Sequence, residues 1–255
     1  MPVVEEVVRL SRSLGDPQFD LAILAEGNAS ALDGDAFWVK ASGHQLGALE
    51  ASGLVKVDLQ AANAFLSGPD LSDDATRGAL ESIVVESSNL LPSVETFMHA
   101  YLLTLPGVQF VGHTHPTPLL ILLSTTQARE LAKQRLFPDE IVCCGPESVF
   151  VPYVDPGLPL AKAIRSAVTE YVERRGEVPK TIWLENHGLI ALGQTAKEVL
   201  GAHIMAAKAA RVWLHGFASG LTMKPLTESQ IDRIHTRPDE HYRQQLLRQL
   251  SGNPA

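Results

Sequence analysis

The chain contains 255 residues, of which 45% are hydrophobic and 20% are charged, a composition typical of a globular protein with a sizeable core. We find no stretch of about 18 apolar residues, which excludes a membrane-spanning helix. The formal net charge of -8 argues against a nucleic-acid-binding face. An anionic substrate would therefore have to be held by local groups.

The start of the chain and its two cysteines predict a cytoplasmic protein. The first six residues lack the basic start and apolar run of a signal peptide. Cys143 and Cys144 are adjacent, which makes a structural disulfide between them a poor hypothesis and favours a reducing compartment. Both follow Ile141 and Val142, and we interpret this apolar run as strand-like.

The first half of the chain predicts a helix at 3–14, a short strand at 37–40 and a helix from Asp58 to Leu66, with 67–92 unassigned. Ser93 is expected to cap the next helix, whose apolar stripe reaches Leu105. Glu95 would lie in the first turn of that helix, where the helix dipole stabilises an anion.

The second half predicts a strand at 108–111, an amphipathic helix over 160–172, a long helix from Thr195 towards Phe217, and another helix beginning at Thr227. We see no internal repeat and no linker-like shift in composition. We therefore expect a single domain over 1–255, with 221–255 forming a C-terminal helical extension. No Gly-x-Gly-x-x-Gly is present, which favours α/β or α+β layering over a dinucleotide-binding enzyme.

Three histidines could hold one divalent metal. His113 and His115 are two residues apart at the end of a predicted strand, so their side chains project from one face. His187 lies in the Asn-His-Gly triplet between two apolar runs, which indicates a tight turn joining strands. Three imidazoles with an open position are typical of catalytic zinc. Two unrelated strand histidines and a turn histidine are the alternative interpretation.

Two Gly/Ser loops could bind an anion through oriented backbone N–H groups. They span residues 27–30, which include Gly27 and Asn28, and residues 40–43, which include Ser42 and Gly43. Ser93, at a predicted helix start, is a further candidate anion contact. Each of these features is also compatible with an ordinary turn or a plain helix cap.

Taken in this order, the motifs resemble the class II aldolase/adducin family. They are the Gly-Asn-x-Ser loop at 27–30, the Lys-x-Ser-Gly loop at 40–43, the Ser-x-Glu-x-x-x-His helix start at 93–99, the His-x-His-Pro strand end at 113–116 and the Asn-His-Gly turn at 186–188. The resemblance covers about residues 3–220. It implies a three-layer α/β/α fold with a largely antiparallel central sheet, and a homotetramer with active sites at subunit interfaces.

The resemblance also implies a reaction. His113, His115 and His187 would hold Zn²⁺, with Mn²⁺ or Co²⁺ as alternatives, and Glu95 would be the acid/base residue. Gly27, Asn28, Ser42, Gly43 and Ser93 would bind the phosphate of a sugar phosphate. The metal would stabilise the enediolate formed when a ketose 1-phosphate is cleaved to dihydroxyacetone phosphate and an aldehyde.

Several alternatives stay open at this point. Relatives in the family use the same site for epimerisation, dehydration or decarboxylation of sugar phosphates or sugar acids, and an adducin-like module keeps the fold without catalysis. Val94 stands where phosphate-binding members often carry a second serine, so a carboxylate or an uncharged end could replace the phosphate. The resemblance also implies a further catalytic tyrosine from a neighbouring subunit, and Tyr242 is the candidate for it.

Overall fold

The computed structural model describes residues 2–85 and 89–237. A seven-stranded sheet lies at its centre, with the strand order β3-β2-β1-β4-β7-β6-β5. Neighbouring strands run antiparallel except β5 and β6, which are parallel. The strands are β1 (Asn28–Asp33), β2 (Ala36–Lys40), β3 (Leu54–Asp58), β4 (Phe110–Thr114), β5 (Val149–Val151), β6 (Thr181–Leu184) and β7 (Gly188–Gly193). The expected, largely antiparallel sheet is confirmed.

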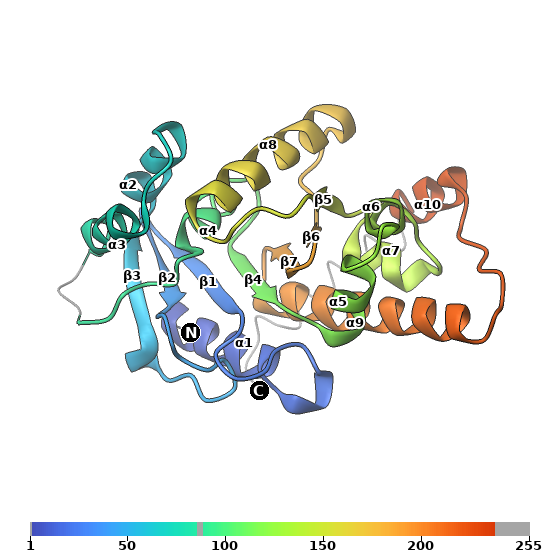
Figure 1. Ribbon diagram of the computed structural model, residues 1–255, viewed down its shortest axis with the longest axis horizontal. Coiled ribbons are helices and arrows are strands. Elements are labelled where there is room, and N and C mark those ends of the chain that lie inside the picture. Colours follow the sequence, from blue (N-terminus) through green and yellow to red (C-terminus); the bar gives the residue numbers. More distant parts are fainter. Residues whose placement is uncertain (1, 86–88, 238–255) are drawn as a thin grey trace.

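Helices cover both faces of this sheet, which gives three layers (Figure 1). On one face lie α2 (Leu59–Ala64), α3 (Asp73–Ser82), α4 (Thr96–Leu102) and α8 (Leu158–Arg175). On the other lie α1 (Val3–Leu14), α5 (Thr117–Leu123), α6 (Ala128–Lys133), α7 (Pro138–Cys144) and α9 (Ala196–Ala218), with α10 (Glu228–His235) beside α7. Short 3₁₀ turns occur at Pro17–Phe19, Ala51–Gly53 and Phe65–Ser67.

Hydrophobic burial on the two faces follows the alternation of the strands. Val111 and Ile190 pack into the cluster beneath α4 and α8, whereas Ala29 and Ala191 pack against α1 and α9. Each face of the sheet therefore contributes to a separate buried cluster, because successive side chains on a strand point to opposite sides.

Most of the predicted elements are present, with shifted ends. Asp58 caps α2 through its side chain, and Thr227 with Gln230 forms a reciprocal capping box that begins α10. The unassigned stretch 67–92 contains α3, which Ser72 caps. Tyr242 and the rest of the extension beyond residue 237 lie outside the described residues.

Two local predictions were wrong. The run at 141–144 belongs to helix α7, which begins at Pro138, so Cys143 and Cys144 are helical and not in a strand. Pro at the first helical position and the acidic Asp139 and Glu140 in the first turn favour this helix start.

The helix predicted to begin at Ser93 begins later. Its first residue is Thr96, and Glu95 occupies the position just before it. Ser93 instead accepts a hydrogen bond from the backbone N–H of Glu95 at 3.3 Å, which turns the chain ahead of the helix. Glu95 therefore precedes α4 and does not lie in its first turn.

Candidate metal centre and active site

The central strand β4 carries the candidate site at its end. Asn28 of β1 lies directly opposite His113 of β4, so both side chains point to the face covered by α4. The strand ends at Thr114, and the backbone N–H of His115 is anchored on the Leu21 carbonyl at 2.9 Å. The neighbouring strand β7 pairs with β4 on its other side.

His187 reaches the same place from the turn between β6 and β7. The turn is tight, because Leu184 pairs with Gly188 and the His187 N–H returns to the Leu184 carbonyl at 3.1 Å. Asn186 adopts a left-handed backbone with φ of 52°, a conformation that asparagine tolerates better than most residues. The predicted turn is present, and its sequence fits its geometry.

The three imidazoles face one another edge to face, with ring centroids 4.8–5.0 Å apart. One ligand atom from each of His113, His115 and His187 lies within 4.8 Å of the others. The Nε2 atoms of His113 and His115 are 3.0 Å apart. Two ligands at the usual zinc–nitrogen distance of about 2.0–2.1 Å in a tetrahedron would be about 3.3 Å apart. The spacing of this pair therefore fits a shared metal ion.

The protonation of His113 and His115 also fits a metal. Burial lowers the pKa of His113 well below its usual value and also lowers the pKa of His115, while the charge of Glu95 opposes both shifts, so the neutral, metal-binding forms of the two rings are favoured. Nδ1 of His113 lies 3.1 Å from the Leu189 carbonyl, which accepts a hydrogen bond from a protonated Nδ1 and leaves Nε2 free to bind a metal. Nδ1 of His115 faces the Glu26 carboxylate at 3.7 Å, a second oxygen partner behind a ligand.

Glu95 lies against this triad. Its carboxylate oxygens are 3.4 Å from Nε2 of His113 and 3.2 Å from Nε2 of His187. Burial alone would raise the pKa of Glu95, but positive charge on His113 and His187 when these rings are protonated, together with the hydrogen bond from the Asn28 amide, outweighs burial and holds the pKa below its usual range. Glu95 is therefore ionised although only 7% exposed. Its Oε1 atom accepts no hydrogen bond within the described residues, which leaves it available for a metal or a substrate proton.

The candidate anion loops come together beside Glu95. Ala41 pairs with Pro92 in an isolated bridge, and the Ser42 N–H donates to the Leu91 carbonyl at 2.9 Å, which brings the second loop next to Ser93. Ser42 and Gly43 are exposed, and Gly43 has a positive φ of 78°. These two residues can therefore approach a ligand.

Lys40 links the backbone before the first candidate anion loop to the backbone after the second one. The sequence motifs alone did not predict this role. Its buried Nζ donates to the Ala25 carbonyl at 3.1 Å and to the His44 carbonyl at 2.5 Å. Burial lowers the pKa of Lys40, while the charge of Glu95 opposes that shift. The sequence signal that could have indicated this role is the position of the lysine at the end of a predicted strand, directly before Ala-Ser-Gly.

The loop motif predicted that Gly27 and Asn28 bind an anion directly, but both residues make other contacts in the structure. The Asn28 side chain is buried and donates to Glu95 at 2.7 Å and to Ser93 at 3.3 Å, so its amide faces the carboxylate. Gly27 has a φ of 68°, and a Cβ at this position would lie 2.6 Å from the His113 carbonyl. Gly27 is thus required by close packing on β4.

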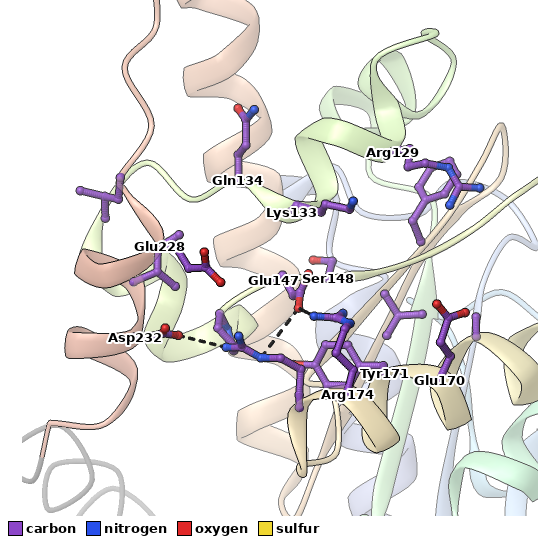
Figure 2. A pocket seen from close by; sticks show the side chains of 17 residues that line it. Arg129, Lys133, Gln134, Glu147, Ser148, Glu170, Tyr171, Arg174, Glu228 and Asp232 are labelled. Atoms are coloured by element: carbon purple, nitrogen blue, oxygen red, sulfur yellow. Dashed lines mark hydrogen bonds and ion pairs between the residues drawn. The ribbon is translucent and has the colours of Figure 1, made fainter.

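A separate cavity of about 540 Å³ lies beside β5, α8 and α10. Figure 2 shows Glu147 and Asp232 pointing towards arginines of α8. The ion pairs measure 2.6 Å from Glu147 to Arg174 and 3.2 Å from Asp232 to Arg175. None of the predicted site residues lines it. The group of residues that could hold a metal, His113, His115 and His187, does not line this cavity, which is therefore not the candidate metal centre.

The layered fold and a histidine triad beside a buried carboxylate define the class: an α/β protein built around a potential metal centre. Residues 5–214 match the model of the "Class II Aldolase and Adducin N-terminal domain". The chain belongs to this family, as the motifs predicted. No helix in the described part of the chain is long and apolar enough to cross a membrane.

Solved structures agree with this assignment. The N-terminal class II aldolase domain of a conserved protein from Thermoplasma acidophilum superposes with a TM-score of 0.67 at 28% identity, covering 84% of this chain and 94% of that one. L-fuculose 1-phosphate aldolase gives a TM-score of 0.67 at 18% identity, covering 91% and 94%. YgbL from Escherichia coli, a putative aldolase/epimerase/decarboxylase, gives 0.66 at 20% identity, covering 91% and 97%.

Among curated proteins, the uncharacterized oxidoreductase YuxG of Bacillus subtilis (strain 168) is 24% identical over 206 residues. The match covers 78% of this chain but only 27% of YuxG. The chain thus spans about a quarter of the length of this relative.

Proposed function

We propose that this protein is a divalent-metal-dependent aldolase that cleaves a ketose 1-phosphate to dihydroxyacetone phosphate and an aldehyde. The observation that carries the proposal is the convergence of His113, His115 and His187 on one point beside the ionised, buried Glu95. Zn²⁺ is the metal we expect, because three imidazole ligands with an open position suit it. A bound metal would act as a Lewis acid on the ketone and hydroxyl oxygens of the substrate.

The residues of the chain would divide the remaining work. Glu95 would transfer a proton to or from the carbon whose bond to the aldehyde fragment breaks, since its Oε1 accepts no hydrogen bond among the described residues and lies 3.2 Å from Nε2 of His187, at the triad. Ser42, Gly43 and Ser93 would hold the anionic end of the substrate. Gly27 and Asn28 would support this end indirectly, through the position of the first loop.

Other activities of the same site are tested by product analysis. A panel of ketose 1-phosphates with the metal-loaded protein should release dihydroxyacetone phosphate and an aldehyde. Recovery of an epimer, a dehydrated sugar or carbon dioxide would replace cleavage by one of the alternative reactions. Absence of any product, together with absence of bound metal, would favour a non-catalytic adducin-like module.

Metal analysis tests the centre itself. We expect one tightly bound ion per chain, lost from His113→Ala while the circular dichroism spectrum stays native. Full occupancy in that variant would disprove the ligand assignment.

The organisation of the whole protein is also part of the proposal. We propose one domain over the entire chain, a cytoplasmic location and a homotetramer with active sites near subunit contacts. The exposed apolar residues Ile23 and Leu24 lie in the loop before Gly27, shortly after Leu21, whose carbonyl accepts a hydrogen bond from the backbone of His115. A second subunit could cover them. The oxidoreductase activity named for YuxG is not transferred, because most of that protein has no counterpart in the alignment.

A further inference from the structure

A buried chain of hydrogen bonds ends on Glu95. The hydroxyl of Ser30 lies 2.6 Å from Nδ1 of His99, and Nε2 of His99 bonds to the side-chain oxygen of Asn28. The amide nitrogen of Asn28 then donates to Oε2 of Glu95 at 2.7 Å. Ser30 and His99 have no exposed surface, and Asn28 is only 3% exposed, so water cannot substitute for a missing partner.

Only one arrangement of protons satisfies all of these contacts. An ionised carboxylate can only accept, so Asn28 must turn its NH₂ group towards Glu95 and its oxygen towards His99. That oxygen also only accepts, so Nε2 of His99 must carry a hydrogen. Burial lowers the pKa of His99 to about 4, so the ring is neutral and its bare Nδ1 accepts the hydroxyl of Ser30.

We propose that His99 is a positioning residue that locks the Asn28 amide in the orientation that donates to Glu95. If the amide turned over, its oxygen would face the carboxylate and repel it. Ser93 cannot prevent this, because a hydroxyl at 3.3 Å can donate or accept equally well. His99 would thereby hold Glu95 beside the ligand histidines, which rests on the proposed role of Glu95 in proton transfer.

Two conservative variants separate positioning from packing. In His99→Gln the amide reaches the place of Nε2 and can still donate to Asn28, whereas in His99→Asn it reaches only the place of Nδ1 and contacts Ser30. We expect His99→Gln to keep kcat within about threefold. His99→Asn should lose about 10- to 100-fold in kcat, the scale of one charge-assisted hydrogen bond.

Two further readouts should stay unchanged in both variants. KM and metal content should match the wild type, since the side-chain hydrogen bonds of His99 are to Ser30 and Asn28 and not to the triad or the exposed loops. Tm should fall by a similar amount in both variants, because each leaves one buried hydrogen-bonding partner unpaired. Equal kcat in the two variants, whether both high or both low, would overturn the proposal. So would a loss of metal from His99→Asn that accounts for its loss of activity.

Nitrogen-15 NMR of the histidine rings in the unmutated, metal-loaded protein tests the proposal without any activity. His99 should show a protonated Nε2 and a bare Nδ1 at neutral pH. A protonated Nδ1 would overturn the proposal. If the wild type cleaves no sugar phosphate but His99 has the expected tautomer, the proposed function fails while the positioning contact stands.

Discussion

The backbone of Gly188 lies directly against the ring of His115. A Cβ at Gly188 would lie 2.7 Å from Cδ2 of His115 and 2.5 Å from the carbonyl oxygen of Thr114. The glycine of the Asn-His-Gly turn therefore lets β7 approach the end of β4 and the ring of His115, and the absence of a side chain here is a condition for the observed arrangement of the triad.

We predict that Gly188→Ala weakens metal binding. The added methyl group must displace either the His115 ring or the backbone of β4, and backbone cannot move cheaply. Metal affinity should fall by about 10-fold or more, the usual scale when the surroundings of metal ligands are disturbed. Chelator competition measures it. Gly201→Ala is the control, because a Cβ there on α9 meets nothing within 4 Å; unchanged affinity in Gly188→Ala would contradict the argument.

A second prediction concerns Glu26, whose carboxylate faces Nδ1 of His115 at 3.7 Å. A carboxylate behind a ligand histidine fixes its tautomer and raises its basicity. Glu26→Gln should therefore lower metal affinity about 10-fold, measured by the same competition. The exposed Glu130→Gln on α6 serves as a charge-matched control. If both variants bind metal like the wild type, Glu26 does not support His115.

The third prediction tests proton transfer. Glu95→Gln keeps the size of the side chain but removes the base, so kcat should fall by about 100-fold or more. Folding should survive, because the amide can still accept from Asn28. Product formation and Tm are measured together, and near-normal turnover would remove Glu95 from the mechanism.

The fourth prediction concerns the anionic end of the substrate. Ser42 is exposed beside Ser93, so Ser42→Ala should raise KM for a phosphorylated ketose about 10- to 100-fold, the cost of one hydrogen bond to a charged group. The unphosphorylated sugar should be hardly affected. Asn28→Ala should instead lower kcat, because its amide contacts Glu95. Equal effects on both sugars would argue against a phosphate site.

The fifth prediction follows from His203, which is fully buried on α9 with its pKa lowered by burial to about 4. The folded state binds this proton less readily than the unfolded state, so stability contributed by the neutral ring is present above about pH 6.5 and lost as pH falls towards 4. Between pH 7 and 5 the loss is about 2 kcal/mol. Urea unfolding at both values should show a shallower pH dependence for His203→Gln; an identical slope would contradict the assignment.

Local sequence signals predicted much of the fold because they act within a few residues. Asp58 ahead of a helical stretch, Thr227 with Gln230, and the two apolar runs around Asn186 each specify a cap or a turn on their own. Local signals also gave the wrong prediction of a strand at 141–144. A short apolar run occurs in both helices and strands, and here it belongs to a helix that begins at Pro138.

The sequence by itself determined the strand that leads to His113, the turn that carries His187 and the family to which the chain belongs. Alternation along a strand and short ordered motifs are local features, so they can be recognised without the fold. Only the tertiary structure decided which groups the side chains of Glu95, Asn28 and His99 contact. Asn28 and Glu95 are 67 residues apart, and β1 must pair with β4 while α4 packs above them before the amide can meet the carboxylate. Contacts of that kind depend on the packing of the layers, which no spacing within one segment specifies.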